Sequence, residues 1–290
     1  MILESHTEKP AFPARLESVS WFHAFIIITC IAIGTAPSKI GYCFRNGVIL
    51  TPLISASVAL ITFYNMFLFV KVGCRFQVYT FEQMWTCTFG SQLVLIPAFI
   101  SIISSISINM YYTQISVQCL TDSLTILAPN LSTIFTDYWF LSFIVSLILV
   151  LPFIFNKSLR NLALSLTIKL GILIVFIICM VIEFVLRYLK DGFNPNHQLN
   201  FFKFDKNLIS AFSSLVTQYL VSPIAWPSIQ HVKNATQSQL VSIFLWQGIF
   251  CFTIYMTMGF FTYFTFFDEH QGGIVFQYYS NKLLHTFFTL

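Results

Sequence analysis

The residues with the clearest chemical implication interrupt the first apolar segment of the chain. Residues 21–47 form an apolar run that contains Gly34-Thr35-Ala36-Pro37-Ser38-Lys39 near its middle. Proline removes a backbone donor and clashes with the preceding helical turn, whereas glycine tolerates non-helical dihedral angles. In hydrocarbon, a freed backbone group is costly unless protein or water satisfies it. The interruption therefore predicts a discontinuous helix that lines a cavity and can bind an ion or a zwitterion.

A second interruption lies in a later apolar segment, where Ser222-Pro223-Ile224-Ala225-Trp226-Pro227 contains two prolines. The N-terminus of a half-helix presents free N–H groups that suit a carboxylate, whereas the broken ends offer carbonyl oxygens to an ammonium group or to Na⁺. An amino acid carries both charges, so we expect one to bind at the two breaks. The candidate substrate-binding residues are Gly34, Thr35, Ala36, Ser38, Ser222, Pro223 and Ile224.

Simpler explanations remain open for several of these residues. The hydroxyl groups of Thr35 and Ser38 can bond to the broken turn itself, and Pro223 and Pro227 can produce a plain kink. Two breaks at matching places in the chain nevertheless favour a binding site over two unrelated kinks.

Lys39 places an ammonium group near the expected midplane of the bilayer, where a charge is costly and by default functional. It can act as a cation-site substitute that replaces Na⁺ as the counter-charge. Alternatively, its long side chain extends to the outer interface. The sequence predicts no cofactor and no metal ligands, and it leaves coupling to Na⁺ or H⁺ open.

The composition indicates a membrane protein. Hydrophobic residues make up 57% of the 290 residues, charged residues only 9%, and the mean hydropathy is +0.77. Too few charges are present to cover a soluble domain of this size, and the net charge of +4 is too small to indicate a nucleic-acid partner. We expect an integral, multi-pass membrane protein whose partners are the lipid bilayer and an amino acid substrate. The oligomeric state is not indicated.

About seven apolar stretches are long enough to be membrane-spanning helices. Residues 1–19 are polar and are expected to form a cytosolic N-terminal tail, so that 20–290 is the transmembrane domain. The segment after the third stretch lacks Lys and Arg and contains the sequon Asn130-Leu131-Ser132, which favours an outside loop. The stretches are roughly 20–44, 48–72, 91–114, 138–155, 162–186, 208–229 and 240–264.

Isolated polar residues also occur inside these stretches. Glu183 and Arg187 lie one helical turn apart and are expected to pair. Lys169 is expected to extend toward the inner interface, and Gln218 to bond between helices. No spacing of residues matches a metal site, a phosphate-binding loop or a nucleophilic triad, so we do not expect an enzyme.

Several motifs together resemble one known family. Residues 34–44, GTAPSKIGYCF, resemble the first-helix motif of the amino acid/auxin permease family of the APC superfamily, which typically reads GAGILALPYAF. Leu151-Pro152, followed by Lys157 and Arg160, is similar to the link between the fourth and fifth helices of that family. Residues 227–234 and 259–272 are similar to the end of its sixth helix and to the ending of its seventh.

The resemblance implies a LeuT-like inverted-repeat transporter fold, an all-α multi-pass architecture with helices 1 and 6 broken. This chain would supply the first repeat (helices 1–5) and helices 6 and 7 of the second. The implied function is secondary active transport of amino acids or related small zwitterions, in the plasma membrane or an endolysosomal or vacuolar membrane. Members of the family usually continue beyond a seventh helix, so we expect this chain to be C-terminally truncated.

Other function classes remain open. A seven-helix receptor fits the number of apolar stretches, but it would need an outside N-terminus, and a DRY-like triplet after the third stretch is absent. A non-transporting amino-acid sensor on the same fold, or an inactive fragment, would share every motif described above.

Overall fold

The computed structural model describes residues 19–33, 40–78, 80–127, 137–145, 147, 159–191, 199–204, 207–219, 229, 231–233 and 235–266. Within these ranges the chain is helical apart from its connections, and no β-strand occurs. Three helices are long and apolar enough, by length and composition, to cross a membrane: Leu50–Phe76, Ala163–Lys190 and Gln237–Thr265. The predicted all-helical class is therefore confirmed for this part of the chain, and the three apolar helices agree with membrane association.

The helices follow the predicted apolar stretches, with one additional short helix. In chain order they are α1 (Trp21–Ile33), α2 (Ile40–Cys43), the 3₁₀ turn η2 (Phe44–Asn46), α3 (Leu50–Phe76), α4 (Phe81–Phe89), the 3₁₀ turn η3 (Ser91–Leu93), α5 (Leu95–Leu127), α6 (Tyr138–Val145), α8 (Leu159–Asp191), α9 (Asn207–Tyr219) and α11 (Gln237–Phe266).

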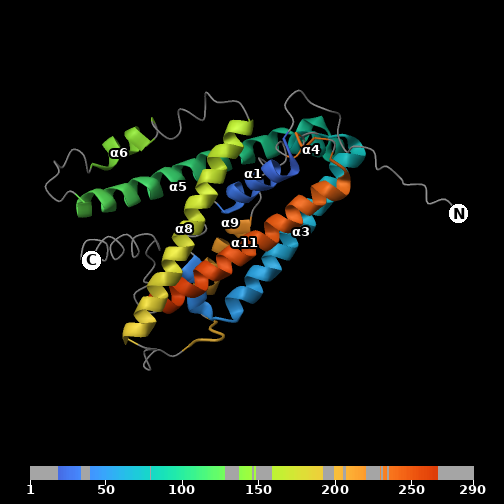
Figure 1. The fold of residues 1–290 in the computed structure, drawn as a ribbon. Coiled ribbons are helices and arrows are strands. Elements are labelled where there is room, and N and C mark those ends of the chain that lie inside the picture. Colours follow the sequence, from blue (N-terminus) through green and yellow to red (C-terminus); the bar gives the residue numbers. More distant parts are fainter. Residues whose placement is uncertain are drawn as a thin grey trace.

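The bundle is organised around α11, which lies against α3 and also contacts α1, α2 and α8 (Figure 1). Buried side chains follow one another along α11, among them Phe244, Cys251 and Tyr255. A helix that is apolar around its whole circumference is typical of a core or membrane-spanning position. In lipid, such helices are held together by close van der Waals packing and hydrogen bonds rather than by the hydrophobic effect.

Gly259 allows α11 to approach the turn that follows α2. A Cβ atom at this position would lie 2.1 Å from the ring of Phe44, far inside van der Waals contact. The Phe44 ring is fully buried and lies 4.8 Å, between ring centroids, from Phe260. The contact between η2 and α11 therefore depends on the missing side chain at Gly259.

Backbone hydrogen bonds fix the start of α1 at one end of the bundle. The Val19 N–H donates to the His231 carbonyl at 2.7 Å, and the Lys233 N–H donates to the Val19 carbonyl at 3.1 Å. The Trp21 indole N–H donates to the Gln239 carbonyl at 3.2 Å. These contacts hold the beginnings of α1 and α11 together.

A second set of backbone contacts lies between the turn before α3 and residues 199–204. The Val48 N–H donates to the Asn200 carbonyl at 2.9 Å, and the Leu50 N–H donates to the Phe201 carbonyl at 3.3 Å. Gly47 has a φ angle of 135°, and a Cβ atom there would lie 2.2 Å from the Phe201 carbonyl oxygen. Only glycine satisfies both the dihedral angle and the close approach.

The short helix α4 was not expected from hydropathy. Thr80 and Gln83 form a capping box, in which the Thr80 hydroxyl accepts from the Gln83 N–H and the Gln83 side chain accepts from the Thr80 N–H. Phe81, Trp85 and Phe89, four residues apart, stack along one face with centroid distances of 6.2 and 4.5 Å. Both signals are present in the sequence, but the helix is too short and too polar to stand out as a span.

Helix α5 continues beyond the predicted end of the third stretch at residue 114. The extension is helical because its apolar residues recur every three to four positions and pack against α6, to one side of the bundle (Figure 1). The packed residues are Val117, Leu120 and Leu124 on α5 and Leu141 and Val145 on α6.

Helix α8 likewise extends past the predicted end at residue 186, to Asp191. The sequon at Asn130 lies outside the described residues.

We expect Gly259→Ala to destabilise the protein by about 1–3 kcal/mol, because the added methyl group forces the Phe44 ring out of its position. Gly248→Ala on the same helix is the matched control, since a Cβ atom there has no neighbouring heavy atom within 4 Å. Thermal unfolding in detergent, followed by tryptophan fluorescence, measures the difference. Equal unfolding temperatures for the two variants would show that the contact between Phe44 in η2 and Gly259 in α11 does not depend on glycine.

Candidate functional site

The predicted site residues lie outside the described residues: Gly34, Thr35, Ala36, Ser38 and Lys39, together with Ser222, Pro223 and Ile224. Residues 1–18 of the expected cytosolic tail also lie outside the described residues. The structure does describe the helices that lead into both interruptions. Helix α1 leads into the first, and helix α9 leads into the second.

The described part of each helix is shorter than a bilayer is thick. It has 13 residues, which corresponds to about 20 Å at 1.5 Å per residue, against a hydrocarbon thickness of about 30 Å. The last carbonyl groups of a helix have no partner within the helix and must find one elsewhere. The carbonyl groups of interest are therefore those of Ala32 and Gln218. Each lies one residue before the last described residue of its helix, α1 or α9.

The hydroxyl group of Tyr255 on α11 joins these two helix ends. It donates to the Ala32 carbonyl at 3.1 Å and to the Gln218 carbonyl at 3.0 Å. A phenolic hydroxyl has one proton, so the two carbonyl oxygens share it, and each retains a lone pair that can accept another donor. Two partially negative helix ends thus meet at one buried point near the middle of α11.

Helix α3 holds the end of α9 from another side. The Ser55 hydroxyl and the Tyr219 hydroxyl are hydrogen-bonded at 2.8 Å, and both residues are buried. The Tyr219 ring meets the Tyr255 ring edge-on, with centroids 5.2 Å apart, a favoured aromatic geometry. The end of α9 is therefore fixed by one tyrosine of its own and one of α11.

Helix α8 supplies a positive charge at the end of α1. The Lys169 ammonium donates to the Cys30 carbonyl at 3.3 Å, and the Cys30 thiol donates to the Leu166 carbonyl at 3.2 Å. A cation at a helix C-terminus is electrostatically favourable. The Lys169 ammonium group is thus bound to α1, and its extension toward the inner interface stays a prediction.

Two buried polar groups lie in the same two helices without a partner among the described residues. They are the Thr29 hydroxyl, three residues before Ala32, and the side-chain oxygen of Gln218. The Thr29 residue is 0% exposed and Gln218 is 6% exposed. An unpaired buried polar atom costs about 1–3 kcal/mol, so such atoms call for a partner. Gln218 was expected to bond between helices, and its backbone carbonyl does so while its side-chain oxygen does not.

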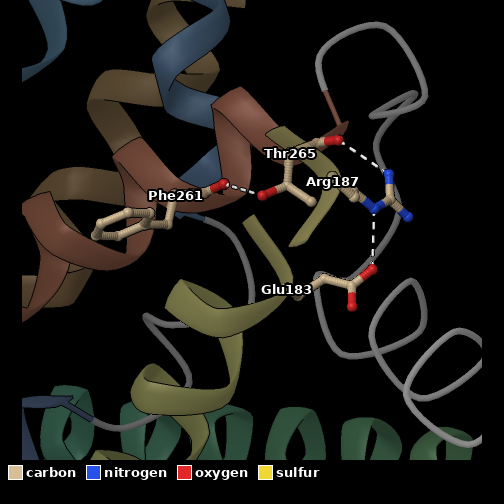
Figure 2. A network of polar contacts seen from close by, with 4 residues as sticks. All are labelled: Glu183, Arg187, Phe261 and Thr265. Carbon is tan, nitrogen blue, oxygen red and sulfur yellow. Dashed lines mark hydrogen bonds and ion pairs between the residues drawn. The ribbon is translucent and has the colours of Figure 1, made fainter. Parts of the chain in front are cut away.

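The predicted pairing of Glu183 with Arg187 is confirmed, and it is structural. The Arg187 Nε donates to the Glu183 carboxylate at 2.9 Å, and its Nη1 donates to the Thr265 carbonyl at 3.1 Å (Figure 2). Figure 2 also shows the Thr265 hydroxyl bonded to the Phe261 carbonyl, at 2.6 Å. Arg187 thereby caps the C-terminal end of α11 and joins it to α8, well away from Tyr255.

Sequence reasoning missed Tyr219 and Tyr255 as site residues. Tyrosine is common in apolar helices, and the role of Tyr255 follows from hydrogen bonds to residues 223 and 37 positions away. One signal was available, since Tyr219 lies only three residues before Ser222, where the second interruption begins.

Comparison with known proteins gives no further assignment. No family model, no curated protein and no solved structure matches this chain. The site therefore rests on its own geometry.

We expect Tyr255→Phe to destabilise the protein by about 1–2 kcal/mol, because the hydroxyl that serves both helix ends is lost while the ring remains. Tyr64→Phe on α3 is the matched control, since Tyr64 is 59% exposed, and it should change stability by less than about 0.5 kcal/mol. Thermal unfolding in detergent compares the two. A Tyr255→Phe protein as stable as wild type would show that the helix ends do not depend on this hydroxyl.

Proposed function

We propose that the protein is a secondary active transporter of amino acids, or of related small zwitterions, with a LeuT-like inverted-repeat arrangement. The observation that carries the proposal is the meeting of two short helices, α1 and α9, at the Tyr255 hydroxyl. Helices that stop inside a membrane domain are typical of transporter binding sites. In this proposal α1 and α2 are the two halves of the first helix, and α9 begins the sixth.

The chemistry of the meeting point suits an ammonium group. The carbonyl oxygens of Ala32 and Gln218 lie near the negative ends of two helices, and each has a second lone pair beside the one that accepts from Tyr255. The side-chain oxygens of Thr29 and Gln218, which have no partner among the described residues, add further acceptors in the same helices. A substrate that supplies N–H donors would satisfy groups that otherwise remain costly to bury.

The packing of the long helices supports the two-repeat arrangement. Helices α3 and α11 would be the second helices of the two repeats, and they pack against each other along the centre of the bundle (Figure 1). Helix α2 packs against α9, so that the segments on either side of the interruptions are neighbours. This is the placement expected if both breaks contribute to one site.

The two sets of backbone contacts described above suit alternating access. One set joins Val19 to His231 and Lys233 near the start of α1, and the other joins Val48 and Leu50 to residues 200–201, ahead of α9. The helix ends meet between these two regions. Separation of one set while the other is retained would open the site toward one side of the membrane only, which is what a transport cycle requires.

Two lysines are candidates for the positive charge that Na⁺ would otherwise supply near the site. Lys169 already places a positive charge at the end of α1, and Lys39 remains a second candidate for the counter-charge. We propose that a fixed cation takes the place of a metal ion at the α1 end. The transport cycle would then be coupled to protons or to exchange rather than to Na⁺.

Uptake and binding by the full chain in proteoliposomes test the proposal. Wild type should bind and accumulate at least one member of a panel of radiolabelled amino acids. Thr29→Val should weaken binding about tenfold, the effect of losing one hydrogen bond to a charged group. Thr253→Val is the matched control, because Thr253 is exposed on α11 and bonds only within its own helix.

The outcomes separate the candidate functions. Binding with accumulation supports a transporter, whereas binding without accumulation would support a non-transporting sensor. If no amino acid binds in the presence or absence of Na⁺ and a proton gradient, the proposal is wrong. Equal weakening by Thr29→Val and Thr253→Val would move the site away from α1.

A further inference from the structure

We propose that this site accepts amino acids without a net positive charge and discriminates against cationic ones, because Lys169 contributes a positive charge and the described helices α1, α3, α9 and α11 carry no carboxylate to balance a second one. The inference rests on the proposed function and specifies its substrate class. It is carried by the distribution of acidic residues in the chain and by the position of one ammonium group.

Acidic residues are absent from the helices that form the site. Residues 20–76 and 207–266, which include α1, α2, α3, α9, α11 and both interruptions, contain no Asp and no Glu. In α8, Glu183 is paired with Arg187, and it lies 14 positions from Lys169, or about 21 Å along the helix. A cationic side chain bound between the described parts of these helices would therefore find only neutral acceptors on them.

The positive charge lies close to the shared acceptors. The Lys169 ammonium contacts the Cys30 carbonyl, and Ala32, whose carbonyl is bound by Tyr255, is only two residues further along α1. At an effective dielectric constant of about 20, two like charges repel strongly enough to weaken binding by more than about tenfold when they lie within roughly 8 Å of each other. A zwitterion avoids this penalty because its carboxylate offsets its own ammonium group.

The arrangement also explains why Lys169 is tolerated in a candidate membrane span. The partially negative end of α1 stabilises the ammonium group, and the carbonyl oxygen gives it a hydrogen bond. The same contact fixes the charge near the site instead of at the membrane surface. Selectivity against cations is then a consequence of how α1 ends.

Citrulline and arginine form a matched ligand pair for the test, since they have nearly the same shape and differ by one charge. Binding of each is measured by competition on the full chain in lipid nanodiscs, against whichever labelled neutral amino acid binds. Wild type should bind citrulline at least about tenfold more tightly than arginine. Lys169→Met should reduce this ratio toward one, and Lys169→Glu should invert it.

Lys190→Met is the control variant, because Lys190 is exposed at the far end of α8 and its removal should leave the ratio unchanged. The wild-type ratio decides the question even if a Lys169 variant does not fold. Equal binding of citrulline and arginine by wild type overturns the inference while the proposed function stands. An unchanged ratio in a folded Lys169→Met protein also overturns it. Failure of every amino acid to bind overturns the proposed function, and the inference with it.

Discussion

A helix that ends inside a bilayer leaves its last carbonyl groups without partners, and hydrocarbon offers none. In the described part of the chain, side chains from the surrounding helices donate to carbonyl groups near the last described residues of α1 and α9. Tyr255 serves Ala32 and Gln218, and Lys169 serves Cys30. The arrangement of the bundle follows from this requirement, because α11 and α8 must lie where their side chains can reach those helix ends.

The same contacts give the bundle two unequal parts. The end of α9 is bonded to α3 through Ser55 and Tyr219 and to α11 through Tyr255. The end of α1 is bonded to α8 through Lys169 and to α11 through Tyr255. Tyr255 is thus one shared contact between α3, α9 and α11 on one side and α1 and α8 on the other. The Trp21–Gln239 and Arg187–Thr265 hydrogen bonds join the same two groups of helices.

The helical class and most helix positions could be predicted, because a long apolar run in the sequence is enough to indicate a helix. The Glu183–Arg187 pair could also be predicted, since the spacing within one helix fixes that contact. Tyr255 could not be found in this way, because its partners belong to other helices. The end of α5 was missed for a related reason, since its last turns are stabilised by packing against α6 and not by hydropathy alone.

The hydrogen bonds between α1 and α11 have a consequence for the order in which the protein assembles. Trp21, in the first turn of α1, is bonded to a residue 218 positions later, and Ala32 to one 223 positions later. At a synthesis rate of about 5–20 residues per second, α1 waits roughly 10 to 40 s for these partners. During that interval its terminal carbonyl groups need temporary donors, from lipid headgroups, water or the insertion machinery. Helix α1 is thus synthesised well before the partners of these native contacts.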